Sequence, residues 1–336
     1  MRLRPAAKMY YSVAGRTVLI EAFDDWSAHA VSHVFAGWFL TLLSSHPDAK
    51  AETTLRIRCS ISPPPIPAGL TSFEITHGGI CYTDEHNYYL KFDASLVVFG
   101  PGTACEVDLW VDKPYELTSG TVVQLLSHAL SPALRRSGVF EIHSAGVIPP
   151  DGDKAIMIAG PSGCGKSTIT SQLARCGWGY LSDDILLLRE AENSIEVRAF
   201  RRFFALTAET LAAVKLPGVA LSEINGAKER VTPQDHFGND PVGQASPAAI
   251  VFPNVTRESN SRLSPLTPTE TMTRLLRLCP WASYDKPTSK EHLRMLGSLA
   301  HSTSAFELHA GTDIMNDPKV AAEVIFDLIS QPSLVR

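Results

Sequence analysis

Residues 160–168 read Gly-Pro-Ser-Gly-Cys-Gly-Lys-Ser-Thr. This stretch fits Gly, any four residues, Gly-Lys and then Ser or Thr, which is the pattern of a phosphate-binding loop (P-loop). Glycine allows positive φ, which brings successive backbone N–H groups against phosphate oxygens. The apolar run 155–159 before the loop is typical of a buried parallel strand, and residues 167–175 after it are compatible with a helix. The sequence therefore predicts an α/β domain in which a strand, loop and helix bind ATP with Mg²⁺.

Every residue of this loop is a candidate nucleotide contact. The candidates are Gly160, Pro161, Ser162, Gly163, Cys164, Gly165, Lys166, Ser167 and Thr168. We expect Lys166 to reach the β- and γ-phosphates and the Ser167 hydroxyl to bind Mg²⁺, with the positive end of the helix directed at the anion. Cys164 stands at a variable position, where a thiol more often fills space than takes a redox role.

The composition is that of a soluble globular protein with room for two domains. The chain has 336 residues, 44% hydrophobic and 19% charged, with a formal net charge of −5. This charge and the lack of basic runs interleaved with aromatics argue against a nucleic-acid partner. The longest apolar stretch, Ala28 to Leu43, is shorter than the roughly 20 residues of a membrane span. The six cysteines are dispersed and predict neither a zinc site nor a disulfide framework, so the cytoplasm is the expected location.

A change in the pattern of expected strands and helices along the chain predicts two domains. The first third mixes strand-like runs, including a hairpin over Tyr10 to Glu21, with a helix around Val31 to Leu43. From Phe140 the chain reads as strand, turn and strand leading into the loop. We expect a smaller α+β domain over residues 1–119, with a role in substrate or partner recognition. The second domain, over residues 120–336, carries the loop.

Asp183 and Asp184 are the best candidates for the chemistry that a phosphate loop cannot supply alone. They follow Trp178 to Ser182, a short strand candidate after the loop helix. In open α/β sheets ligands lie at the carboxyl ends of the strands, and this strand should run parallel to the one before the loop. One carboxylate can then hold Mg²⁺ while the other accepts the proton of an incoming hydroxyl. The alternative is ordinary turn chemistry, which adjacent aspartates also favour.

His143 is a further candidate, in the strand that leads towards the loop. An imidazole beside the acidic pair would tune its basicity. The alternative is a structural histidine, which is the usual role of a lone histidine in a strand.

Three motifs resemble, in their order and spacing, the catalytic domain of the bacterial HPr kinase/phosphorylase family. These are His143-Ser-Ala-Gly146, the loop 160–168, and Gly177-Trp-Gly-Tyr-Leu-Ser-Asp-Asp184. Residues 201–206 and 248–253 are similar to divergent HPr-kinase-related serine kinases, some of which phosphorylate a lasso peptide. The resemblance covers roughly residues 138–336. It implies an α/β fold, in which a C-terminal P-loop kinase domain of HPr kinase type has a mixed central sheet.

The resemblance also implies roles for these residues. Lys166 and Ser167 would handle ATP and Mg²⁺, and Asp183 would be the base acting on a serine hydroxyl. Asp184 would be its metal-side or structural neighbour, although the two aspartates could exchange roles, and His143 would adjust the pair. The implied partner is a peptide or protein with an acceptor serine, and a homo-oligomer is a further expectation.

The sequence departs from the family pattern after the acidic pair. The Glu-Ile-Arg-Gly-Leu-Gly-like run that supplies a magnesium-binding Glu is not present between Arg189 and Thr207. Phosphorolysis, HPr as substrate and a hexamer therefore do not follow. Arg201 and Arg202 stand in the corresponding neighbourhood as a candidate phosphate clamp, the alternative being a solvated face.

Other classes of function are alternatives to a serine kinase. An ABC-type ATPase is disfavoured, because the sequence has no Leu-Ser-Gly-Gly-Gln-like signature and no run of four apolar residues ending in Asp-Glu. A regulatory or scaffold protein that binds nucleotide without transfer remains an alternative, as does a small-molecule kinase.

Overall fold

The computed structural model describes residues 4–330, apart from 39, 44–52, 60–62, 76–77, 85, 94, 101–104, 193 and 217–227. The chain forms two compact units. Unit 1 comprises Met1–Phe140 together with Ser283–Lys290, and unit 2 comprises Glu141–Ala282 together with Glu291–Arg336. The expected division at residue 119/120 differs from this one, because helix α2 (Ser119–Arg136) belongs to unit 1.

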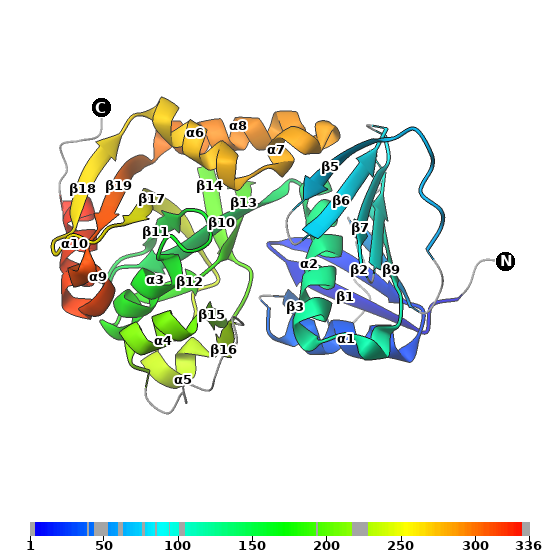
Figure 1. Cartoon of the computed structure of the whole chain (residues 1–336), viewed down its shortest axis with the longest axis horizontal. Helices are drawn as coiled ribbons and strands as arrows, with labels where there is room; N and C mark the ends of the chain where they lie inside the picture. Colours follow the sequence, from blue (N-terminus) through cyan, green and yellow to red (C-terminus); the bar gives the residue numbers. More distant parts are fainter. Residues whose placement is uncertain are drawn as a thin grey trace. The chain divides into compact units, whose positions relative to one another are not determined.

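Unit 1 is built on a mixed nine-stranded sheet with the order β3-β1-β2-β4-β9-β8-β7-β6-β5 (Figure 1). Its strands are β1 (Ala7–Val13), β2 (Arg16–Ala22), β3 (Leu40–Leu42), β4 (Thr53–Cys59), β5 (Thr71–Ile75), β6 (Gly79–Thr83), β7 (Tyr88–Phe92), β8 (Ser95–Phe99) and β9 (Cys105–Val111). The expected hairpin is present, because β1 and β2 pair antiparallel around Ala14 and Gly15, both of which have positive φ. Helices α1 (Asp25–Ala36) and α2 pack against β4.

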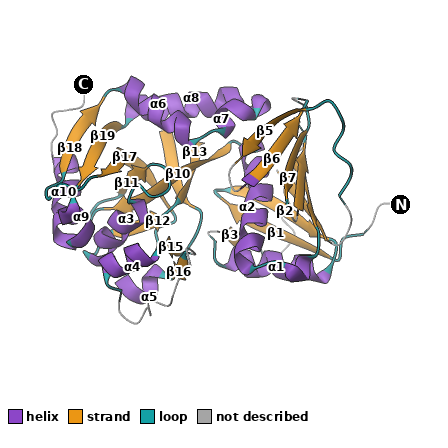
Figure 2. Cartoon of the chain, viewed as in Figure 1, coloured by secondary structure: helices purple, strands orange, loops and turns teal. Residues whose placement is uncertain are grey.

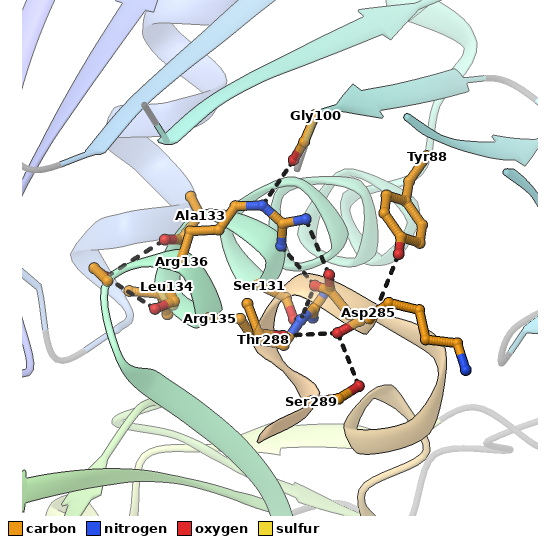
Figure 3. A network of polar contacts seen from close by, with 12 residues as sticks. Tyr88, Gly100, Ser131, Ala133, Leu134, Arg135, Arg136, Asp285, Thr288 and Ser289 are labelled. Carbon is orange, nitrogen blue, oxygen red and sulfur yellow. Dashed lines mark hydrogen bonds and ion pairs between the residues drawn. The ribbon is translucent and has the colours of Figure 1, made fainter. Parts of the chain in front are cut away.

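A buried network of charges holds the segment 283–290 within unit 1 (Figure 3). The Nε of Arg135 donates to Asp285 Oδ2 at 2.9 Å, and Arg136 donates to the two carboxylate oxygens at 2.6 and 2.9 Å. Burial would raise the pKa of Asp285, but the two guanidinium groups hold this pKa below its usual value. The Lys286 N–H also donates to the Tyr88 hydroxyl at 3.1 Å. A segment far along the chain is thereby fixed to α2 and β7.

Unit 2 is built on a mixed eight-stranded sheet, ordered β11-β10-β13-β14-β17-β19-β18, with β12 paired to β10 and β11 also paired to β17. Its strands are β10 (Val139–Ile148), β11 (Lys154–Ala159), β12 (Gly179–Ser182), β13 (Ile185–Ala191), β14 (Ser194–Ala199), β17 (Gln244–Val255), β18 (Arg262–Leu266) and β19 (Ser304–Ala310). A separate two-stranded sheet joins β15 (Phe204–Leu206) to β16 (Glu229–Val231). Both units are thus of mixed α/β composition (Figure 2).

Helix α3 (Lys166–Arg175) buries its apolar side in the main core of unit 2. Ile169 and Leu173 pack there with β10, β11, β17 and β19, and α10 (Pro318–Ser330) adds Ile325 to the same core. The remaining helices are α4 (Ala208–Val214), α5 (Pro233–Phe237), α6 (Pro268–Leu278), α7 (Trp281–Tyr284), α8 (Lys286–Ser302) and α9 (Thr312–Asn316).

Among the described residues, no helix combines the length and the apolar character that crossing a bilayer requires.

Candidate functional site

The glycine-rich loop lies between the end of β11 at Ala159 and the start of α3 at Lys166. Gly163 and Gly165 have φ of +83° and +94°, a region that side-chain-bearing residues rarely adopt. Gly160 does not have positive φ, in contrast to the expectation for the loop glycines, but a Cβ there would lie only 2.5 Å from Cys164 Sγ. Gly160 is therefore required for close packing within the loop. Burial raises the pKa of the Cys164 thiol, in agreement with a space-filling role.

Lys166 folds back into the loop. Its Nζ donates to the carbonyl oxygens of Gly160 at 2.8 Å and Pro161 at 3.0 Å, and the residue is buried. Burial lowers the pKa of this ammonium group, because the charged form is disfavoured away from water. Ser167 is half-buried beside it, while the Thr168 hydroxyl lies 3.0 Å from that of Thr210. The Thr168 side chain thus fixes α3 to α4, whereas Lys166 faces the loop.

The acidic pair follows β12, on the loop side of the sheet. β10 lies antiparallel to both β11 and β12, so β11 and β12 run in the same direction and end at the same edge. The parallel arrangement expected from the sequence is therefore present, with β10 between the two strands. Asp183 and Asp184 consequently lie at the end of the sheet where the loop begins.

Asp183 faces inwards and contacts the loop. The residue is 1% exposed and its Oδ2 accepts the Ala205 N–H at 3.0 Å, while the nearby Ser167 side chain acts to lower the pKa of the carboxylate. Burial, and then the charge of Asp184, raise the pKa of Asp183 to about 6. The bond to Ala205 also fixes the small β15–β16 sheet at this site.

Asp184 faces outwards and contacts two basic groups. Its Oδ1 lies 2.8 Å from His143 Nε2, its Oδ2 lies 3.4 Å from Arg201 Nη1, and its side chain is 20% exposed. Burial works to raise the pKa of Asp184, but the hydrogen bond and charge of His143, followed by the charge of Arg201, hold this pKa well below its usual range. His143 thus lies beside the acidic pair, as the sequence predicted, and its contact is with the second aspartate.

Arg201 and Arg202 differ in position. Arg201 reaches Asp184, whereas Arg202 is exposed. The structure therefore places Arg201, the first of the two candidate clamp residues, at the acidic pair.

Three residues near the site escaped the sequence analysis: Phe203, Lys228 and Arg230. Arg201 and Arg230 border the Phe203 ring, with their guanidinium carbons 6.0 and 5.0 Å from its centroid. The charge of Lys228 acts on both Lys166 and Asp184. Lys228 and Arg230 belong to a segment that reads as a long loop, and only the pairing of β15 with β16 brings them to the site.

The side-chain oxygens at this site fit Mg²⁺ better than a metal ion that takes all its ligands from the protein. Among the described residues, no group of three or more His, Cys, Asp and Glu is arranged to hold a metal ion. Mg²⁺ usually takes one or two protein oxygens and completes its shell with water and phosphate oxygens. The Ser167 hydroxyl and the Asp183 carboxylate, which lie near each other, would supply the one or two protein oxygens.

Comparison with known proteins finds a likeness at the level of structure. No family model matches the sequence, and no curated protein does. The HPr(Ser) kinase/phosphatase from Coxiella burnetii shares 10% identity with this chain at a TM-score of 0.31. The alignment covers 56% of this chain and 94% of that chain. At such a TM-score the function has to be argued from the residues of the site.

Proposed function

We propose that this chain is an ATP-dependent kinase that transfers the γ-phosphoryl group to a serine hydroxyl of a peptide or protein. The observation that carries the proposal is the pair of carboxylates at the loop, with Asp183 buried on the inner side and Asp184 at the outer side. Nucleotide binding alone needs the loop, whereas transfer also needs a group that receives the hydroxyl proton. The choice of serine comes from the resemblance of the three sequence motifs.

Backbone amides of the loop and the N-terminus of α3 would hold the phosphates of ATP. Lys166 would exchange its bonds to the carbonyls of Gly160 and Pro161 for bonds to phosphate oxygens, because an anion is a stronger partner for an ammonium group than a peptide carbonyl. Ser167 and Asp183 would hold Mg²⁺, which supplies neutralisation of the phosphate charge. ATP and Mg²⁺ are therefore the proposed cofactors.

We assign the base to Asp184 and the metal side to Asp183, the reverse of the first expectation from the resemblance. Two differences between the carboxylates support this assignment. Asp183 is 1% exposed and lies beside Ser167, the proposed metal ligand, so it is the less accessible of the two to an acceptor hydroxyl. Asp184 is partly exposed and has a low pKa, so it is ionised at neutral pH.

In the transfer step the acceptor oxygen forms a bond to the γ-phosphorus while the bond to the β–γ bridging oxygen breaks and ADP leaves. The hydroxyl proton passes to Asp184, and His143 holds that carboxylate in place at 2.8 Å. A carboxylate with a low pKa is a weak base. In phosphoryl transfer, however, positioning and electrostatic stabilisation supply most of the acceleration. Arg201, 3.4 Å from Asp184, would stabilise charge on the transferred group.

The test compares Asp183→Asn with Asp184→Asn. We expect Asp184→Asn to bind MgATP like the wild type and to transfer no radiolabelled phosphate from [γ-³²P]ATP to serine peptides. We expect Asp183→Asn to lose the Mg²⁺ dependence of nucleotide binding, measured with a fluorescent ATP analogue. Full transfer by Asp184→Asn would refute the base assignment. A wild-type protein that binds MgATP and labels no acceptor would favour the regulatory alternative.

A further inference from the structure

A cluster of basic side chains lies beside the acidic pair. This basic cluster consists of Arg201 and Arg230, which border the Phe203 ring, and Lys228, whose charge acts on Asp184. Arg230 is in the middle of β16, and Lys228 directly precedes this strand. Arg230 stands opposite Ala205 in the β15–β16 pair, and the Ala205 N–H in turn bonds to Asp183. The position of the cluster is therefore fixed relative to the acidic pair by the small sheet.

The other face of this small sheet explains its rigidity. Phe204, Leu206 and Val231 are buried there in an apolar cluster with α4. Because side chains alternate across a strand and Ala205 pairs with Arg230, these two residues share the opposite face. Arg230 is thus presented away from the core by a well-packed support.

The charges in the cluster do not balance. The chain as a whole has a formal charge of −5, yet Lys228 and Arg230 form no ion pair with a carboxylate among the residues that the structure describes. Burial, and then the nearby charge of Arg201, lower the pKa of Arg230. Arg201 alone of the three reaches a carboxylate, that of Asp184. Like charges held together in this way repel unless an anion lies between them.

We propose that Lys228 and Arg230 bind carboxylate groups that flank the acceptor serine, so that this chain selects acidic peptides. The inference rests on the proposed kinase function and adds the class of acceptor. An arginine fork matches a carboxylate in two hydrogen bonds, and a lysine adds a mobile point charge. Such complementarity at an exposed rim chiefly gives specificity and a faster encounter.

The position of the cluster favours the acceptor over the nucleotide as its ligand. The glycine-rich loop, Lys166 and the N-terminus of α3 already surround the place of the phosphates. Arg201 contacts Asp184, which the acceptor hydroxyl must approach, and Arg230 adjoins Arg201 through Phe203. The cluster therefore continues outwards from the proposed base, where residues next to the acceptor serine would lie.

The experiment measures peptide binding first, because binding does not require transfer. Two fluorescein-labelled probes, Glu-Glu-Ser-Glu-Glu and Gln-Gln-Ser-Gln-Gln, are titrated by anisotropy with MgADP present. We expect the wild type to bind the acidic probe roughly tenfold more tightly. Arg230→Glu should remove this preference, and Arg230→Lys should keep most of it. The matched control is Arg277→Glu, an exposed arginine on α6 far from β16 in Figure 1, which makes the same charge change and should keep the preference.

Equal affinity of the wild type for the two probes would overturn the inference. So would an Arg230→Glu variant whose Kd for MgADP rises more than its Kd for the acidic probe, because the cluster would then serve the nucleotide. Phosphate transfer to the same probes is measured separately. Acidic preference in binding without any transfer would support the peptide site while contradicting the kinase function, so the two proposals fail in distinguishable ways.

Discussion

Asp285 in unit 1 and Asp184 in unit 2 each lie beside arginine, but their surroundings differ in burial and in balance of charge. Asp285 is fully buried, and two arginines of α2 donate three hydrogen bonds of 2.6 to 2.9 Å to it. Asp184 is 20% exposed and has His143 at 2.8 Å and Arg201 at 3.4 Å. In the first arrangement both carboxylate oxygens are bonded to arginine, and the bonds hold the segment 283–290 to α2. The second leaves a partly exposed carboxylate with the charge of Lys228 nearby, and Lys228 forms no ion pair with a carboxylate among the residues that the structure describes. An anionic ligand can still pair with that charge.

The largest effect is expected where the buried network of unit 1 is broken. Asp285→Ala leaves Arg135 and Arg136 without their carboxylate, and an uncompensated buried charge costs about 3–5 kcal/mol. Urea unfolding followed by circular dichroism should show this loss of stability. The control is Glu190→Ala, which breaks an exposed ion pair with Arg294 and should leave the midpoint unchanged. Equal midpoints for the two variants would mean that Asp285 does not hold the segment.

Replacement of the loop lysine should reduce phosphate transfer and leave stability almost unchanged, in contrast to Asp285→Ala. Lys166→Met removes a buried ammonium group bonded to two carbonyls, and we expect little change in stability, because the flexible apolar side chain fills a similar volume. Phosphate transfer should fall by at least about a hundredfold, since a preorganised charge at the phosphates is lost. Transfer assays and urea unfolding on the same preparation measure both effects. If the variant unfolded at lower urea concentration and transferred phosphate normally, Lys166 would have a structural role like that of Asp285.

Much of the loop and its surroundings follows from local sequence, whereas the two charge clusters do not. The glycine-rich loop, its flanking strand and helix, and the position of Asp183 and Asp184 at a strand end depend on short segments with strong patterns. The attachment of Asp285 to Arg135 joins residues 150 positions apart. Arg230 likewise reaches the site only because β16 pairs with β15. No periodicity or motif in a single sequence encodes such pairings, because they depend on which surfaces remain to be buried once the sheets have formed.

The roles of the two aspartates also depend on contacts that a single sequence does not encode. The sequence placed both aspartates beside the loop, and the resemblance made Asp183 the base while allowing the two roles to be exchanged. The difference in their surroundings comes from Ala205 and Ser167 on one side and His143 and Arg201 on the other. These are tertiary contacts, so burial decides which carboxylate a substrate can reach.

A smaller effect concerns stability at the site itself. The pKa of Asp183 in the fold, about 6, is above its ordinary value of 3.8, so folding favours the protonated form. Its contribution to stability is therefore present below about pH 4 and is lost as the pH rises through 6. Asn does not ionise, so Asp183→Asn keeps the stability that the wild type loses when Asp183 ionises. The variant should be more stable than the wild type by about 1–3 kcal/mol at pH 7, with little difference at pH 4.

Urea midpoints from pH 4 to 8, in the presence of EDTA, measure this difference between Asp183→Asn and the wild type. A gain that is the same at every pH would show that ionisation of Asp183 is not its cause. Asp285→Asn provides the contrast. Its carboxylate has a lowered pKa in the fold, so this variant should lose stability at pH 7 and lose less as the pH falls.

The smallest effect is expected at His143, which touches only the outer side of the acidic pair. His143→Ala removes the hydrogen bond that most lowers the pKa of Asp184, so this pKa should rise. Transfer at pH 7 should fall by about tenfold through looser positioning of the carboxylate, and the acid limb of the pH profile of kcat should move to higher pH. His143→Gln, whose amide can still donate to Asp184, should recover part of both changes. An unshifted acid limb in His143→Ala would mean that Asp184 does not carry the proton, and the base would then have to be sought at Asp183.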